Sequence, residues 1–450
     1  MPKGLQTLEF SFKGTSLTHF GGLFLIQRFC KSLGLRRRLQ RLLKAAPPTG
    51  NYSSADLILA LLLILIAGLR RINKTEILQY NGLFLSLIGL EHFPDQSTLR
   101  RFLRRLSPSA IRQMVRCHDH FRRQLFSHPQ PRTTLIFDLD AVVLTLYSHQ
   151  QRARVGYNPK NKGHRSYHPL LCFEAHGQEF WHGSLRPGDS GANTGVIHFF
   201  KRCLAKVPPQ IARSRIRVRA DAGFFSRKLV SYLDQVGCGY IIVARTYPNL
   251  CALAVQAGFR PLHFGWEVAE FAYRPQKWKQ AHRFIVVRRP LPEDPEELRQ
   301  LTLFKDRQYS YSVLVTNLKL DRWRVYRAYL ARANVEKTIR ELLYDLPLNK
   351  IPTHQWVANV AYFQMLLFAY NLVHWFKRLC LPADYRGATV ETVRSDFLVL
   401  PAKLTSRGGR NVLQLPKDYH YQKAFLQAAR RTQKLRLDHK PRGSMKSSCK

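Results

Sequence analysis

The chain has 450 residues, 45% hydrophobic and 12% aromatic, which is enough apolar material for a folded core and excludes a disordered basic arm. Its 72 Lys and Arg against 29 Asp and Glu leave a formal net charge of +43. Such an excess attracts polyanions and releases their counterions, so nucleic acid is the first expected partner and an anionic membrane surface the second. This length is typical of two or three domains.

Neither a secretory signal nor a membrane span is expected. The start MPKGLQTLEF has no apolar run after its charge, and the longest apolar run, residues 57–69, is shorter than the roughly 18 residues that span a bilayer. The eight cysteines are scattered, without a C-x-x-C pair or a His cluster at metal spacing. We therefore expect reduced thiols in a cytoplasmic protein.

Residues 1–130 are expected to form a helical N-terminal DNA-binding region. Ser53 or Ser54 can cap an apolar helix, and Asp95 or Ser97 can cap a helix with leucines on one face. A charged helix face is often simply solvated, but the net charge favours contact with DNA phosphates. The basic residues on the opposite face of this second helix are Arg100, Arg101, Arg104 and Arg105.

Residues 131–250 show a strand-like period that predicts an α/β layer. The β-branched segment TTLIFDLDAVVLTLYS precedes two strands joined at the HGQ turn. Two helices, ANTGVIHFFKRCLAKV and RKLVSYLDQVG, then alternate with the strands RIRVRAD and GYIIVAR. This order is typical of a mixed sheet with packed helices.

The remaining residues are expected to form three further segments. Short strands in 251–325 predict a small β-rich insertion rather than a continuation of the α/β layer. Residues 326–400 are predicted to be helical and to complete the catalytic core. Residues 401–450 are expected to form a basic tail, disordered at SRGGR and KPRGSMKSSCK.

Chemistry on phosphodiesters commonly uses divalent metals held by carboxylates, so acids fixed by strands or helices are the candidates. Asp138 and Asp140 alternate with apolar residues in LIFDLDAV and point to one face of a core strand. Such a pair is costly unless it is paired or metal-bound. Asp221 ends the strand IRVRAD, before a turn that Gly223 permits, although a lone Asp there is more often a cap.

A third candidate acid lies on a predicted helix. Glu336 has Arg332 one turn before it and Arg340 one turn after it. Alone, Glu336 is more simply explained as one half of an ion pair with Arg340. Taken together in a chain of this charge, the acids favour a metal site.

The ordered segments DLDAV, GYNPKNKGHRSYHPLL, LRPGDSGANTG, VRADAGF, YLARANVEKTIREL and NVAYFQMLLFAYNLVHW resemble the DDE transposases of bacterial insertion sequences. The closest resemblance is to the thirteen-eighty group, related to the larger type-four group. It covers residues 133–378, and PDQSTLRRFLRRL is similar to that group's opening region. The resemblance implies an α/β fold: an RNase H-like, retroviral integrase-type catalytic core with a β-rich insertion between the second Asp and the Glu, preceded by the helical N-terminal region.

The resemblance implies two Mg²⁺ ions, replaceable by Mn²⁺, held by Asp140, Asp221 and Glu336. The family commonly places its first Asp in a D-x-T pattern, which favours Asp140 and leaves Asp138 as an additional candidate ligand. Val142 stands where that pattern has Thr.

Around the third acid, related groups carry Tyr, then Arg after two residues, Glu after three and Lys after six. Tyr329, Arg332 and Glu336 match this spacing, whereas Leu343 occupies the Lys position. Lys337 or Arg340 could replace the missing Lys in gripping a phosphate. The DNA-binding candidates near the acids are Arg219, Tyr329, Arg332, Lys337 and Arg340.

The expected function is that of a transposase that binds terminal inverted repeats and catalyses Mg²⁺-dependent DNA cleavage and strand transfer. The expected partners are transposon ends, target DNA and a second copy of the chain in a synaptic complex, with no membrane, in a bacterial cytoplasm and on its nucleoid. Leu343 and Val142 favour the alternative, a catalytically inactive or domesticated DNA-binding protein that retains the fold. A structural RNA-binding protein would leave the paired acids unexplained.

Overall fold

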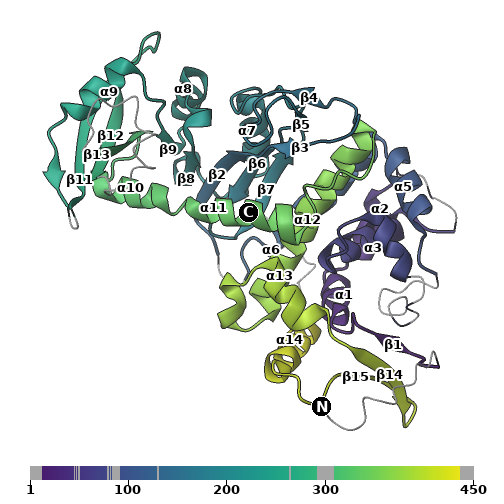
Figure 1. The fold of residues 1–450 in the computed structure, drawn as a ribbon. Helices are drawn as coiled ribbons and strands as arrows, with labels where there is room; N and C mark the ends of the chain where they lie inside the picture. Colours follow the sequence, from purple (N-terminus) through teal and green to yellow (C-terminus); the bar gives the residue numbers. More distant parts are fainter. Residues whose placement is uncertain are drawn as a thin grey trace, which may run out of the picture. The chain divides into compact units, whose positions relative to one another are not determined.

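The computed structural model describes residues 13–44, 46, 48, 51–78, 81, 83, 92–128, 131–262, 265–290 and 309–435 (Figure 1). The chain forms two compact units, which we call the helical unit, Met1–Leu125 with Tyr344–Lys450, and the sheet unit, Phe126–Leu343. The segment 326–400, expected as one set of catalytic-core helices, is thus divided between the units after Leu343.

The helical unit is built around one long apolar helix, α12. By length and composition α12 could cross a membrane, but 83% of its most apolar 18-residue stretch is buried inside the protein. It packs against α3, α5, α6 and α14. The burial explains a helix that is apolar around most of its circumference. The helices of eight or more residues described in this unit are α1 (Leu23–Ser32), α2 (Leu35–Leu42), α3 (Ser54–Ile66), α5 (Gln96–Arg105), α6 (Pro108–Leu125), α12 (Trp356–Cys380) and α14 (Gln422–Lys434).

Side-chain caps fix where two of these helices begin. The Ser53 hydroxyl accepts a hydrogen bond from the Asp56 amide at 3.2 Å, and Asp95 Oδ1 accepts one from the Thr98 amide at 2.8 Å. Each cap satisfies a backbone donor that has no partner within the helix. The alternatives left open by the sequence are therefore resolved in favour of Ser53 and Asp95.

Part of the expected disordered tail is ordered. β14 (Ala402–Arg407) and β15 (Arg410–Gln414) form a hairpin, and β14 also pairs with β1 (Leu17–Thr18). Gly408 and Gly409, with φ of 56° and 72°, make the two-residue turn within SRGGR. This backbone conformation favours glycine, so the prediction of disorder at SRGGR was wrong. The segment KPRGSMKSSCK lies outside the described residues.

The sheet unit contains a nine-stranded sheet in the order β10-β11-β12-β13-β9-β8-β2-β6-β7 (Figure 1). β2 pairs in parallel with β8, and β8 with β9, whereas the other pairs are antiparallel. The predicted α/β fold with a mixed sheet is confirmed. The strands are β2 (Leu135–Ala141), β6 (Leu170–Glu174), β7 (Glu179–Ser184), β8 (Ile216–Ala220), β9 (Gly239–Val243), β10 (Arg260–Pro261), β11 (Glu267–Tyr273), β12 (His282–Pro290) and β13 (Tyr309–Thr316).

The β-rich insertion continues this sheet, so the prediction of a separate layer was wrong. β13 pairs with β9, placing Leu314 opposite Val243 and Thr316 opposite Ile241. Without β13, one edge of β9 would present unpaired backbone groups. The strand pattern identified the insertion but could not identify its pairing partner.

Helices cover both faces of the extended sheet. α7 (Val196–Ala205), α8 (Arg227–Gln235) and α9 (Pro248–Val255) contribute buried residues to one core with β2 and β8, while α10 (Arg322–Leu330) packs on β11 and β12. α11 (Ala333–Arg340) follows α10 after a short break. A second small sheet, in the order β3-β5-β4, lies between β2 and β6 in the chain.

Candidate active site

Two of the predicted acids lie at the carboxyl ends of neighbouring parallel strands in the large sheet. β2 and β8 run parallel, and their register pairs Leu139 with Ala220. Asp140 and Asp221 are the next residues along the two strands, so both stand at the same edge. Ligands of α/β sheets commonly bind at the carboxyl ends of such strands.

Asp221 is fixed by the turn that follows it. Its Oδ1 accepts a hydrogen bond from the Gly223 amide at 2.8 Å, which caps a short 3₁₀ helix. A Cβ on residue 223 would lie 2.9 Å from that same oxygen and 3.2 Å from the Cβ of Ala192, so any larger residue would displace the Asp221 carboxylate or Ala192. Asn193 Nδ2 donates to the Gly223 carbonyl at 2.6 Å and holds the turn from the outside. Asp221 is thus a capping residue whose second oxygen remains available.

Glu336 supplies a third carboxylate from α11. Its side chain is exposed, and the ion pair with Arg340 that would have explained it structurally is not formed. Within the described residues, neither Glu336 nor Asp221 makes any ion pair. In a chain of net charge +43, two carboxylates without a cationic partner point to an external cation.

Electrostatics relate the three acids to one another. Burial raises the pKa of Asp140 to about 6; Arg332 opposes this, while the negative charges of Asp221 and Glu336 add to it. Burial also raises the pKa of Tyr329, and the same three carboxylates raise it further against the opposing charge of Arg332. Asp221 and Glu336 are therefore each near enough to repel the charge of Asp140.

Arg332 provides the positive charge within this group. Its Nη2 donates to Asp140 Oδ2 at 2.9 Å and to the Leu139 carbonyl at 3.0 Å, and the side chain is almost fully buried. Burial alone would lower the pKa of Arg332, but Asp140, Tyr329 and Asp221 raise it above its ordinary value. The predicted direct DNA contact does not suit this placement, because the guanidinium is buried and bound to β2.

Asp138 is bound internally. Arg219 Nε donates to Asp138 Oδ1 at 2.6 Å and Nη2 to Oδ2 at 2.7 Å, while Nη1 donates to the Ala328 carbonyl at 2.6 Å. Both side chains are buried, and burial raises the pKa of Asp138 against the opposing effect of Arg219. Asp138 thus has no free oxygen for a metal, and Arg219 is not placed to contact DNA. The pair instead attaches α10 to β2 and β8.

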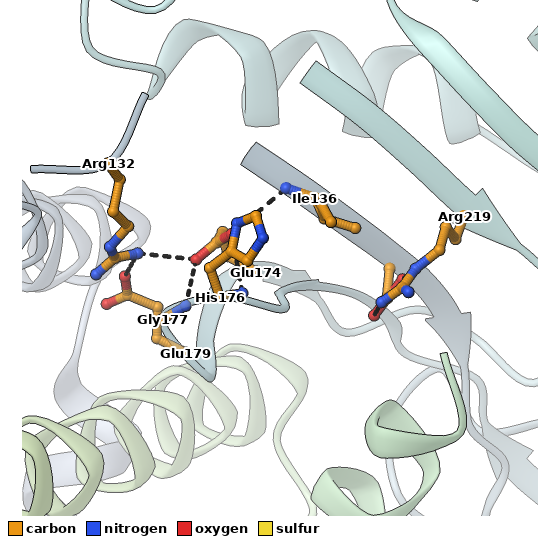
Figure 2. A network of polar contacts seen from close by, with 8 residues as sticks. Arg132, Ile136, Glu174, His176, Gly177, Glu179 and Arg219 are labelled. Atoms are coloured by element: carbon orange, nitrogen blue, oxygen red, sulfur yellow. Dashed lines mark hydrogen bonds and ion pairs between the residues drawn. The ribbon is translucent and has the colours of Figure 1, made fainter. Parts of the chain in front are cut away.

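A second buried network lies toward the start of β2 and was missed by the sequence analysis. Figure 2 shows Arg132 between Glu174 and Glu179, whose carboxylates it contacts at 2.8 Å each. Both glutamates are fully buried, and Glu174 also accepts from the Gly177 amide at 2.6 Å. A Cβ on Gly177 would lie 2.3 Å from the Arg132 guanidinium. The network closes the β6–β7 hairpin at the end of β2 opposite Asp140.

Tyr329, also predicted to bind DNA, is half-buried on α10, whereas most of the other predicted DNA-binding residues lie on exposed helix faces. Lys337 and Arg340 are exposed on α11, beside Glu336. Leu343 is half-buried in the π-helical turn 341–345 and brings no cation to the family's Lys position. In the helical unit, α5 carries the four predicted arginines. Arg100 is half-buried, and the exposed ones are Arg101, Arg104 and Arg105.

The donor set fits Mg²⁺ in chemistry and charge. Hard divalent ions prefer carboxylate oxygens, and a cation would relieve the repulsion among the three acids. In the described part of the chain, however, no three Asp, Glu, His or Cys side chains converge closely enough to hold a metal ion. Arg332 instead compensates the charge of Asp140 directly.

Comparisons with known proteins show the family of the chain. A solved structure of piggyBac transposase, a synaptic complex with hairpin DNA, is similar with a TM-score of 0.46 and 13% sequence identity, covering 84% of this chain and 78% of that one. No curated protein matches significantly. The model of the family described as transposase DDE domain group 1 matches residues 2–437. Because this match spans almost the whole sequence, the chain belongs to the group 1 family of transposase DDE domains.

Proposed function

We propose that the protein is a transposase that binds and cuts the ends of its own element, with Asp140, Asp221 and Glu336 as the metal-binding carboxylates. One observation carries this proposal. Asp221 and Glu336, from separate elements, add negative charge at Asp140, and neither has an ion-pair partner among the described residues of a strongly basic chain. Such an arrangement is costly without a function.

We further propose that the sheet unit contains an RNase H-like catalytic core. The strand order β7-β6-β2-β8-β9 supports this, because three antiparallel strands are followed by two parallel ones with the first strand at the centre. β10 to β13 extend this core between the second and third acids. Asp140 on the central strand and Asp221 on its parallel neighbour are the positions such a core offers for catalysis.

When bound, Mg²⁺, or Mn²⁺ in its place, would polarise the scissile phosphate and lower the pKa of a water. Asp140, Asp221 and Glu336 would hold it. Water adds to phosphorus, the P–O3′ bond breaks, and the 3′ oxygen leaves and takes up a proton. The resulting 3′ hydroxyl then attacks a phosphorus of the target DNA and forms a new P–O3′ bond, while the target's own P–O3′ bond breaks and its 3′ oxygen leaves as a hydroxyl with the proton.

Other residues position the acids and the DNA. Arg332 holds Asp140 and, through the Leu139 carbonyl, the end of β2. Lys337 and Arg340, exposed on the helix of Glu336, contact phosphates near the cleavage point. The arginine face of α5 contacts the duplex of the inverted repeat. A second copy of the chain pairs two transposon ends, and the complex acts on the bacterial nucleoid in the cytoplasm.

The second candidate function is DNA binding without cleavage. Leu343 at the family's Lys position favours it, because the described turn places no cation there. The carboxylates without ion-pair partners favour the enzyme instead.

The test is cleavage of DNA carrying the element's inverted repeats, with Mg²⁺ or Mn²⁺ present or removed by chelation. Asp221→Asn retains an acceptor for the Gly223 amide, and Glu336→Gln changes an exposed side chain, so both variants should fold. We expect each to lower cleavage at least a hundredfold while DNA binding persists. Glu270→Gln, which weakens surface ion pairs with Arg283 and Arg322, is the matched control and should cleave normally. Undiminished cleavage by both site variants would refute the metal site; no cleavage by the wild type would favour the second candidate.

A further inference from the structure

The segment between the first acid and β6 is a basic surface that the proposed chemistry does not use. It forms a small sheet of β3 (Leu144–Thr145), β5 (Arg165–Tyr167) and β4 (Arg154–Val155), which we call the β3–β5–β4 sheet. Residues 141–173 contain no Asp or Glu. The Lys and Arg side chains of this segment are all exposed: Arg152, Arg154, Lys160, Lys162 and Arg165. The surface therefore suits a polyanion.

Two tyrosines are interleaved with these bases. Tyr147 is 78% exposed and Tyr157 is 72% exposed, the two highest values for large hydrophobic side chains in the described part of the chain. Val155, between the bases Arg154 and Lys160 in sequence, is also exposed. Exposed rings that alternate in sequence with several cations mark a binding surface more than a packing defect. A nucleic acid combines an anionic backbone with flat, largely apolar bases. Aromatic side chains can stack on those bases.

The tyrosines are held by an ordered scaffold. Asn158, next to Tyr157, is buried and donates from Nδ2 to Thr145 Oγ1 at 3.0 Å. The Tyr167 hydroxyl donates to the Gln151 carbonyl at 2.6 Å. The first bond joins the strand that precedes Tyr147 to the loop that carries Tyr157, and the second joins β5 to the segment before β4. A backbone fixed in this way loses little conformational freedom when bases stack on the rings that it carries.

The β3–β5–β4 sheet is also connected to the segments that carry Asp140 and Asp221. The Val142 amide donates to the Pro169 carbonyl at 3.2 Å, two residues after Asp140. A Cβ on Gly156 would lie 2.1 Å from the Gly188 carbonyl oxygen, so β4 packs tightly against the loop 186–195. That loop supplies Asn193, which bonds the Gly223 carbonyl in the turn after Asp221. The β3–β5–β4 sheet is therefore fixed relative to the proposed cleavage point.

We propose that the β3–β5–β4 sheet binds an unpaired DNA strand next to the cleavage point, with bases stacked on Tyr147 and Tyr157. The inference rests on the proposed function for the choice of DNA as the partner. An intact duplex needs only the cations, because its bases already stack on one another. Exposed rings add affinity only for bases that are unstacked, such as those of a strand at a nicked or cut end.

The test measures binding of the full-length protein to labelled DNA by fluorescence anisotropy in chelator, so that no cleavage occurs. The probes are an oligothymidylate of about 12 nucleotides and a duplex of the same length. We expect Tyr147→Ala with Tyr157→Ala to weaken single-strand binding roughly tenfold or more, and duplex binding less than about threefold. Tyr147→Phe with Tyr157→Phe keeps both rings and should bind like the wild type. Tyr247→Ala, which removes a 46% exposed tyrosine outside the β3–β5–β4 sheet, is the matched control.

Equal losses on the two probes, or no loss with the alanine variants, would overturn the inference. Stronger binding of an oligouridylate of the same length, lost with the same variants, would also overturn it, because RNA would then be the partner. The binding result is independent of cleavage. If the variants of Asp221 and Glu336 still cut DNA, the proposed metal site is wrong. A selective loss of single-strand affinity would support the binding surface even in that case.

Discussion

Arg332 and Asp140 form a buried ion pair at the edge of the large sheet, with 2.9 Å between Nη2 and Oδ2. The same nitrogen donates to the Leu139 carbonyl, so one guanidinium fixes both the acid and the end of its strand. Asp140 thereby keeps a compensating charge although Asp221 and Glu336 repel it. The pair holds the first acid in place, and this role can be tested by substitution.

Arg332→Ala should destabilise the protein by about 3–5 kcal/mol, because it leaves Asp140 buried without a compensating charge. Chemical denaturation of the metal-free protein measures the free energy of unfolding. Arg340→Ala removes an exposed arginine from α11, the helix that follows Arg332, and should stay within about 0.5 kcal/mol of wild type. Similar small effects of both substitutions would show that the ion pair contributes little to stability.

The pKa of Asp140 predicts a pH dependence of stability. In the folded protein this pKa rises from its ordinary value of 3.8 to about 6. A raised carboxyl pKa means that the folded state binds the proton more tightly. The contribution of Asp140 to stability is then full below pH 3.8 and is lost as the pH rises through about 6. The total change is about 2–3 kcal/mol.

Asp140→Asn removes this titration and serves as the comparison. The difference in unfolding free energy, wild type minus Asp140→Asn, should fall between about pH 4 and pH 7 in chelator. Metal-dependent cleavage by the wild type should rise over the same interval, because only the ionised carboxylate can hold a cation. A difference that stays flat with pH would contradict the raised pKa.

The buried pair of Asp138 and Arg219 predicts that Asp138 has a structural role. Asp138→Asn should lower stability by about 3–5 kcal/mol, since Arg219 is left buried with a weakened partner. At a temperature where the variant is folded, its cleavage should show the metal-concentration dependence of wild type. Asp140→Asn should instead require much more metal or lose cleavage. If Asp138→Asn shifts the metal dependence and Asp140→Asn does not, Asp138 is the first ligand.

The sequence predicted the position of the acids better than their partners. Asp140 and Asp221 each end an apolar strand, and parallel neighbours bring such ends together, so the local pattern sufficed. Arg219, the partner of Asp138, is 81 residues away in the sequence. Periodic patterns describe only neighbouring residues, so they could not predict this pairing. Arg219 and Arg332 were expected to contact DNA because the sequence shows their charge but not their burial.

The two buried glutamates are a second case. Glu174 and Glu179 flank a turn that was predicted, yet their shared partner Arg132 precedes them by more than 40 residues, and it was not predicted. The pairing of β13 with β9 was missed for a similar reason. Strand patterns give the faces of a strand and its length, whereas the neighbour is chosen by tertiary packing.

Leu343→Lys should strengthen DNA binding, because it restores a cation at the family's Lys position. Leu343 is only half-buried, so a lysine can bury its stem and extend its ammonium group into solvent at small cost to stability. One added phosphate contact should steepen the slope of log affinity against log salt by roughly one. Binding of inverted-repeat duplex at several salt concentrations measures that slope. Leu343→Met, a neutral side chain of similar length, is the control and should leave the slope unchanged. A lysine variant with the wild-type slope would show that this turn does not face DNA, and Lys337 and Arg340 would then be the phosphate contacts of this helix.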